Sequence, residues 1–506
     1  MTTPATNGHH ALATRREWIG LATIVLPLMV LAMDLTILHL AVPTLATALK
    51  PSPVQLLWMV DIYGFFLAGS LITMGSLGDR IGRRKLLMAG AIAFTIATIL
   101  AAFATSANML IAARAILGIA GATLAPSTLS LIRNMFHDDR QRTTAVAVWG
   151  TSFAAGGMLG PLVGGLLLEH FQWHAIFLVP VPVMLVLLIA APRLLPEYRN
   201  PAPGSLDVFS AVLSLSAVLS LIYSCKHIAQ EGMNELSLIF FLLGLLLGIF
   251  FVRRQHRLEH PLIDLQLFRS PVFSATVLIL VMNAFSMFAV SFFNAQYFQL
   301  ALGMSPAIAG LWTLPGGIMV IISSMFSPVY VRHLARPVVI AICLMICALG
   351  FAVLTFASPG GLPVIIAGML LICIGAGPVG TLCSDGIVSA APPERVGTAA
   401  ALPSTSAEFG GALGIALLGS VGTAIFRLDV AGKALSTTPS TMSDAITLAQ
   451  QLPPDAAAAV MSASRHAFVH GYAVVAAISA VLMVMAAIIM LTVVYRKKTS
   501  VLSIVH

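Results

Sequence analysis

A short polar stretch between two long apolar runs reads Gly75-Ser76-Leu77-Gly78-Asp79-Arg80-Ile81-Gly82-Arg83-Arg84-Lys85. Gly82 allows the tight turn that so short a connection needs. Asp79 can pair with a neighbouring arginine, and the cationic residues that follow it would remain in water. We therefore expect a polar turn between two membrane-spanning helices.

The composition of the whole chain is that of a membrane protein. Of its 506 residues, 58% are hydrophobic and 9% are charged, and the mean hydropathy is +0.97. A soluble protein carries charge on about a quarter of its residues, because its surface faces water. Most of this surface must therefore face lipid. The first apolar run is too long for the apolar core of a secretory signal, so we interpret it as an uncleaved first span.

Fourteen apolar segments are long enough to cross a bilayer, which takes about twenty residues of helix. We expect these spans at about 18–42, 54–76, 86–105, 109–133, 143–168, 174–192, 206–226, 236–252, 272–297, 306–330, 337–357, 362–389, 398–426 and 468–495. An even number of spans places both termini on the same side.

The basic residues indicate which side that is. With this span count, 21 of the 27 Lys and Arg residues fall on the side of the termini. The opposite side holds Lys50, Lys226, Arg427, Lys433 and Arg465, and Arg114 lies within a span. Positive loops stay in the cytoplasm, so we expect both termini there. The same asymmetry accounts for the net charge of +8 without a nucleic-acid partner.

An internal repeat divides the chain into two halves. The pattern from Gly118-Ile119-Ala120-Gly121 to Gly156-Gly157-Met158-Leu159-Gly160 recurs about 254 residues later, ending at Gly410-Gly411-Ala412-Leu413-Gly414. Same-topology repeats in a carrier imply two helical bundles around a central site. We expect an all-α membrane protein of two six-helix bundles with an inserted two-helix hairpin. The predicted parts are a tail at 1–17, the first bundle at 18–192, a linker and hairpin at 193–271, the second bundle at 272–495 and a tail at 496–506.

Ionisable residues inside the spans are costly in lipid and therefore indicate function. Asp34, Asp61 and Arg114 are predicted in one layer in the outer half of the first bundle. Glu408 lies near mid-depth in the thirteenth span, and Asp385 lies near the cytoplasmic end of the twelfth.

These carboxyl groups admit two interpretations. A carboxyl group in a low-dielectric cavity can hold a proton near neutral pH and release it when a cation arrives, which would exchange cation for proton. Alternatively, Asp34 or Asp61 forms a structural ion pair with Arg114. Arg114 would then either adjust the charge of its neighbours or brace the bundle.

Several motifs resemble those of the major facilitator superfamily. The loop at 75–85 is similar to its signature loop, which implies a gating role for Gly75, Asp79, Arg80, Gly82, Arg83 and Arg84. The second-half counterpart, Val331-Arg332-His333-Leu334-Ala335-Arg336, lacks the Asp and the glycines. Arg114-Ala115-Ile116-Leu117-Gly118 is similar to a motif linked to proton coupling. The antiporter motif of the family is matched by Gly156, Gly160, Pro161, Gly164 and Gly165.

The first span resembles one subfamily in particular. Asp34-Leu35-Thr36 is similar to the Asp-x-Thr motif of fourteen-span drug:proton antiporters, such as bacterial pumps for quaternary ammonium compounds, ethidium and methyl viologen. That resemblance implies a monomeric transporter in the bacterial cytoplasmic membrane, with no cofactor or metal and driven by the proton gradient. It implies lipophilic mono- and divalent cations as substrates. An exporter or importer of an endogenous metabolite or lipid is the alternative, and an enzyme is disfavoured because no nucleophile or metal set clusters.

A cation site also needs aromatic and adaptable apolar walls. Candidate cavity residues are Tyr63, Phe153, Asn283, Phe285, Phe288, Asn294, Tyr297 and Trp312. Helix packing is the alternative role for each aromatic. An outer loop is expected at 427–467, with a helix-compatible run from Ser443 to Gln451, and a part in gating drug exit is one hypothesis for it.

Overall fold

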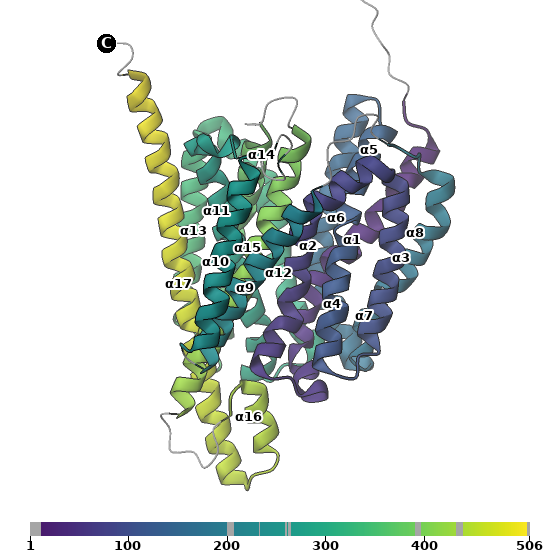
Figure 1. Ribbon diagram of the computed structural model, residues 1–506. Helices are drawn as coiled ribbons and strands as arrows, with labels where there is room; N and C mark the ends of the chain where they lie inside the picture. Colours follow the sequence, from purple (N-terminus) through teal and green to yellow (C-terminus); the bar gives the residue numbers. More distant parts are fainter. Residues whose placement is uncertain are drawn as a thin grey trace, which may run out of the picture.

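The computed structural model describes residues 12–199, 207–231, 233–258, 261, 265–389, 396–431 and 439–502, and every regular element among them is helical (Figure 1). The helices are α1 Arg15–Leu49, α2 Pro53–Ile81, α3 Arg83–Ala102, α4 Ala107–Gly121, α5 Leu124–Met135, α6 Asp139–His170, α7 His174–Leu178, α8 Pro180–Leu194, α9 Val208–Glu231, α10 Glu235–Gln255, α11 Pro271–Gln296, α12 Pro306–His333, α13 Arg336–Leu354, α14 Leu362–Ser389, α15 Val396–Ala431, α16 Met442–Ala449 and α17 Pro454–Leu502, with short helices η1 Leu267–Arg269 and η2 Tyr297–Ala301.

The prediction of fourteen spans is confirmed. In the described residues, fourteen helical segments are long and apolar enough to cross a membrane. The fourth span consists of α4 and α5, and the sixth consists of α7 and α8. The break before α8 falls at Pro180, which lacks the backbone N–H that would continue α7.

The helices form two bundles and a hairpin, as predicted. Helices α1 to α8 pack together, as do α11 to α15 with α17, and the bundles meet where α6 contacts α12 and α2 contacts α15. In the hairpin, α10 packs chiefly against α9, and α9 contacts α2 and α15. The hairpin therefore lies across one of the two lines along which the bundles meet (Figure 1).

Glycines join one helix pair in each bundle through direct backbone contact. A Cβ atom at Gly156 of α6 would lie 2.1 Å from the carbonyl oxygen of Met29 in α1. A Cβ atom at Gly414 of α15 would lie 2.0 Å from the carbonyl oxygen of Phe285 in α11. Two further glycines make equivalent approaches: Gly160 and Gly410. The sequence repeat is thus a repeat of glycine seams, here the α1–α6 seam and the α11–α15 seam.

The outer loop is shorter than predicted. Helix α15 continues to Ala431 and α17 already begins at Pro454, so much of 427–467 is helical. The helix-compatible run forms α16, with Thr441 as its N-cap. Helix α16 lies at the end of the molecule opposite the C-terminal end of α17 (Figure 1). We call these the predicted outer end and the predicted cytoplasmic end.

The terminal tails are also shorter than predicted. Helix α1 begins at Arg15, where Thr14 and Glu17 form a capping box, and α17 continues to Leu502. Both helix ends carry polar residues, at the start of α1 and at the end of α17. Such helix ends can extend past the apolar core of the membrane into its polar interface. Residues 1–11 and 503–506 of the predicted tails lie outside the described part.

Candidate functional site

Arg114 and Asp34 form a buried ion pair between α4 and α1. Nη1 of Arg114 lies 2.7 Å from Oδ2 of Asp34, and the two side chains are 1% and 3% exposed. The Arg114 guanidinium also donates through Nε to the carbonyl oxygen of Met59 at 3.2 Å and through Nη2 to that of Val60 at 3.3 Å. Arg114 therefore joins its own helix α4 to both α1 and α2 at one level.

Tyr63 and Asp61 lie beside this pair on α2. The Arg114 guanidinium carbon lies 4.6 Å from the centre of the Tyr63 ring, a cation–π contact. Asp61 is 2% exposed and follows Val60, one of the two residues whose carbonyls Arg114 binds. The predicted layer of Asp34, Asp61 and Arg114 is thus present, with Tyr63 added to it.

Glu408 lies at the meeting line of the two bundles. It is 6% exposed on α15, one helical turn before Ala412. Ala412 is 3.1 Å from the position that a Cβ atom at Gly64 of α2 would take. Tyr63, the neighbour of Gly64, is within electrostatic range of Asp34, Arg114 and Glu408. Among the described residues no cation forms an ion pair with Glu408, so its environment differs sharply from that of Asp34.

Asp385 lies apart from these buried carboxyl groups. Its Oδ2 atom is 2.5 Å from Nη2 of Arg336, and its side chain is 57% exposed at the predicted cytoplasmic end. A surface ion pair of this kind contributes about 0–1 kcal/mol. Because Asp385 is solvated, it does not share the low-dielectric surroundings on which its predicted coupling role depended. The second-half loop at 331–336, which lacks its own Asp, pairs with α14 instead.

The polar loop at 75–85 forms the turn that the sequence predicts. Gly82 has φ of +111°, and it ends α2 and precedes α3. Asp79 Oδ1 lies 2.5 Å from Nη2 of Arg83. Arg84 interacts with Glu197, whose Oε1 also accepts from the Arg84 backbone N–H at 3.1 Å. Gly75 and Arg80 lie in the last two turns of α2. The first pair lies within the first bundle, and the second joins that bundle to the segment that follows α8.

The glycine motif of α6 faces two neighbours. Gly156, Gly160 and Gly164 contact α1, and Cβ atoms at these positions would lie 2.1 to 2.5 Å from α1 atoms. On another face, a Cβ atom at Gly165 would lie 2.2 Å from the carbonyl oxygen of Pro306 in α12. The carbonyl of Pro161 would similarly be 2.4 Å from a Cβ atom at Gly310. The motif therefore joins α6 both to its own bundle and to the other one.

Gly156→Ala is expected to destabilise the protein by about 1–3 kcal/mol, because the new Cβ would overlap the α1 backbone. Gly157→Ala is the matched control, since a Cβ there meets nothing within 4 Å. This control should leave stability unchanged or raise it by up to about 1 kcal/mol through helix propensity. Unfolding of the purified variants measures both. An equal loss of stability in the two variants would contradict the close contact between Gly156 and α1.

The bundles touch at further points in their predicted outer halves. Gln299 Nε2 donates to the carbonyl oxygen of Leu40 at 3.0 Å. Ser305 Oγ donates to Glu169 at 3.4 Å. The His39 ring, 3% exposed, packs edge-on against Phe292 with ring centres 5.9 Å apart. The two bundles are therefore in direct contact at the predicted outer end.

His39 and Gln299 were missed by the sequence reasoning. His39 follows Asp34 by five residues in the same span, so a search of spans for ionisable residues that included histidine would have found it. Gln299 lies in η2, a π-helical turn that follows α11, and no sequence pattern predicts such a turn.

The predicted cavity residues separate into two groups. The half-buried ones are Phe153, Phe285, Phe288 and Trp312. Asn283 is 7% exposed in α11. Tyr297 is fully buried and donates to the Ser358 carbonyl oxygen at 2.5 Å, and Asn294 accepts from the Tyr472 hydroxyl at 2.5 Å. The Tyr297 hydroxyl and the Asn294 side-chain oxygen therefore both have hydrogen-bond partners within the second bundle.

Known proteins resemble this chain along most of its length. The Mycolicibacterium smegmatis multidrug efflux pump LfrA is 40% identical over 479 residues, which cover 93% of this chain and 95% of that protein. The Salmonella typhimurium methyl viologen resistance protein SmvA is 35% identical over 475 residues, covering 91% and 94%. The tetracenomycin C resistance and export protein of Streptomyces glaucescens is 32% identical over 408 residues, covering 80% and 76%.

Solved structures agree with the fold. A bacterial homologue of the human lysosomal transporter Spinster, in an inward-facing conformation, superposes with a TM-score of 0.66 at 16% identity, covering 95% of this chain and 99% of that one. A peptide transporter in complex with sulfate gives 0.62 at 17% identity, covering 94% of each chain. The sequence model of the Major Facilitator Superfamily matches residues 24–415. With its fourteen apolar helices, this chain is a multi-pass membrane transporter that belongs to the Major Facilitator Superfamily.

Proposed function

We propose that this transporter exports lipophilic mono- and divalent cations from the bacterial cytoplasm, and that inward proton movement drives the export. The names of its relatives, multidrug efflux pump and methyl viologen resistance protein, support drug export. The termini would lie in the cytoplasm, the protein would act as a monomer in the inner membrane, and no cofactor would take part. The proposal of proton coupling rests on Glu408, which is buried and forms no ion pair with a cation in the described residues.

A buried carboxyl group without a cation partner is more stable protonated than as a carboxylate. Glu408 meets this description at the line where α2 and α15 join the bundles. An arriving lipophilic cation would stabilise the carboxylate, and the proton would leave. Proton and cation would thus exclude one another at one group, which is the thermodynamic requirement of an exchanger.

Asp34 would act in a different way. Its negative charge is already satisfied by Arg114 at 2.7 Å. Protonation of Asp34 would break that pair and leave the Arg114 charge buried and uncompensated, at a cost of several kcal/mol. The pair would therefore respond to a proton by changing the packing of α1 against α4. We assign Glu408 to the proton–cation exchange and Asp34 with Arg114 to the accompanying change of conformation.

Ethidium transport in proteoliposomes tests this proposal. An imposed proton gradient should drive ethidium movement by the wild type, and a protonophore should stop it. Asp34→Asn should lose this transport but still bind ethidium, because Glu408 is retained. Correctly inserted wild type that moves no ethidium under a gradient would refute cation export and favour an endogenous substrate. Transport that persists with the protonophore would refute proton coupling alone.

A further inference from the structure

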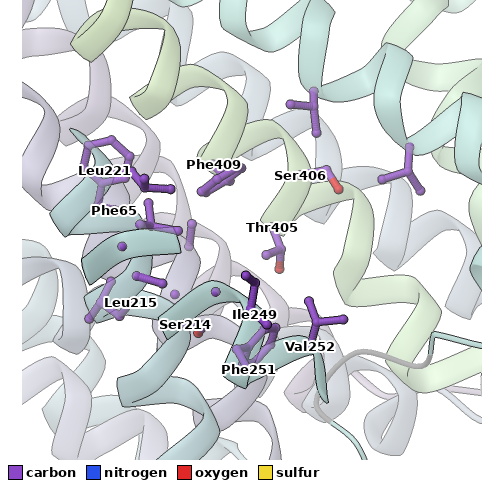
Figure 2. A pocket seen from close by; sticks show the side chains of 18 of the residues that line it. Phe65, Ser214, Leu215, Leu221, Ile249, Phe251, Val252, Thr405, Ser406 and Phe409 are labelled. Atoms are coloured by element: carbon purple, nitrogen blue, oxygen red, sulfur yellow. The ribbon is translucent and has the colours of Figure 1, made fainter. Parts of the chain in front are cut away.

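A cavity of about 770 Å³ lies beneath the inserted hairpin, walled by α9, α10, α2, α11 and α15 (Figure 2). Apolar side chains make up most of its wall, among them Phe65, Leu215, Ile249, Phe251, Val252 and Phe409. Its volume falls within the range of pockets that enclose small molecules, about 300–1,000 Å³. None of its lining residues is acidic. The buried carboxyl groups described above therefore do not line this cavity.

The cavity opens where α10 leaves the rest of the protein. Because α10 packs chiefly against α9, a gap remains between α10 and the second bundle. Three α10 residues that line the gap are 44–47% exposed: Leu245, Ile249 and Val252. These positions lie within a predicted span, so the solvent at the opening is hydrocarbon. A lipid chain can therefore enter without crossing water.

Two polar side chains of the lining indicate how a ligand would be oriented in the cavity. Arg253, two residues before the end of α10, lines the cavity at the predicted cytoplasmic end. Its neighbour Arg254 is bound to Asp207 at 3.1 Å, but within the described residues Arg253 forms no ion pair. On the α2 wall, Thr73 is 6% exposed, and its hydroxyl has no hydrogen-bond partner in the described part of the chain. An anionic group and an ester or carbonyl oxygen would satisfy these two side chains.

We propose that this cavity binds one phospholipid of the cytoplasmic leaflet that has an anionic headgroup. One acyl chain fills the apolar space, the phosphate lies at Arg253, and Thr73 donates to an ester carbonyl. The exported cation is a poorer occupant, because the lining offers no carboxylate and Arg253 repels positive charge. The lipid fills the gap that otherwise remains between α10 and the second bundle. This site does not depend on what the transporter exports.

Native mass spectrometry of the purified full chain, titrated with phosphatidylglycerol or phosphatidylcholine, tests the site. Gly248→Leu should remove the tightest lipid-binding step, because a side chain at Gly248 has open space and would fill the cavity. Leu246→Trp is its control, since Leu246 is 65% exposed and does not line the cavity. Arg253→Gln should weaken phosphatidylglycerol binding by about fivefold, the effect of one basic residue near a membrane. Arg257→Gln, outside the lining, is the matched control.

Three results would overturn the proposal. Wild type could bind the two lipids equally, or Gly248→Leu could retain the tightest step. Alternatively, Gly248→Leu could lose ethidium binding while lipid binding stays unchanged, which would assign the cavity to the exported cation. The lipid site is supported if the wild type prefers phosphatidylglycerol and both cavity variants reduce that preference. Neither control variant should reduce it.

Discussion

Glu408→Gln is expected to abolish gradient-driven export completely while leaving the protein folded. Glutamine keeps the size of the side chain and its neutral state but can neither release a proton nor attract a cation. The change adds no charge to the buried line between α2 and α15, so stability should change little. Transport in proteoliposomes, with and without a proton gradient, measures the loss.

Two variants control this experiment. Asp385→Asn removes an exposed carboxylate from the same bundle and should leave gradient-driven transport largely intact. Glu408→Asp keeps the titrating group and should retain part of the activity. Gradient-driven transport by Glu408→Gln at the wild-type rate would remove Glu408 from the mechanism and leave Asp34 or Asp61 as the coupling group.

Arg114→Gln is expected to lower the free energy of unfolding by about 3–5 kcal/mol, because it leaves the buried Asp34 carboxylate without its partner. It also removes two hydrogen bonds to α2 carbonyls. Reversible unfolding in mixed micelles measures the loss. Arg336→Gln breaks the exposed pair with Asp385 and should cost no more than about 1 kcal/mol.

A double variant separates charge from packing. Asp34→Asn combined with Arg114→Gln removes both buried charges, so it should recover part of the stability that Arg114→Gln loses. A double variant less stable than either single one would show that Arg114 stabilises the bundle through its contacts with α2 and not through Asp34.

The membrane spans and the glycine seams could be predicted because each requires a regular pattern of residues in the sequence. Lipid demands an apolar run of fixed length, and close helix contact demands glycine at fixed spacing, as at Gly156 and Gly160. The helix ends were less predictable. Alanine-rich residues after Pro454 form helix outside the membrane as readily as inside it, so the last helix begins before the apolar run from which the span was predicted.

The site was only partly predictable, because the identity of a buried residue does not reveal its partner. Asp34 and Glu408 are both carboxyl groups at depth, yet one has a cation at 2.7 Å and the other has none in the described structure. Asp385 is close to the end of its helix, and Arg336, far away in sequence, pairs with it in the predicted cytoplasmic interface. Tertiary packing determines which residues pair, and the pattern of residues in a single sequence does not identify those pairs.

The glycine seams also determine how force would pass through the molecule. Helices whose backbones touch have no layer of side chains that could slide, so α1 with α6, and α11 with α15, behave as two stiff beams. A helix of 35 residues such as α1 is about 50 Å long. A tilt of about 10° at its middle would then move each end by about 4 Å. Asp34 and Glu408 lie on different beams, so under the proposed mechanism a single proton or cation at mid-depth would have the leverage to open one face of the protein and close the other.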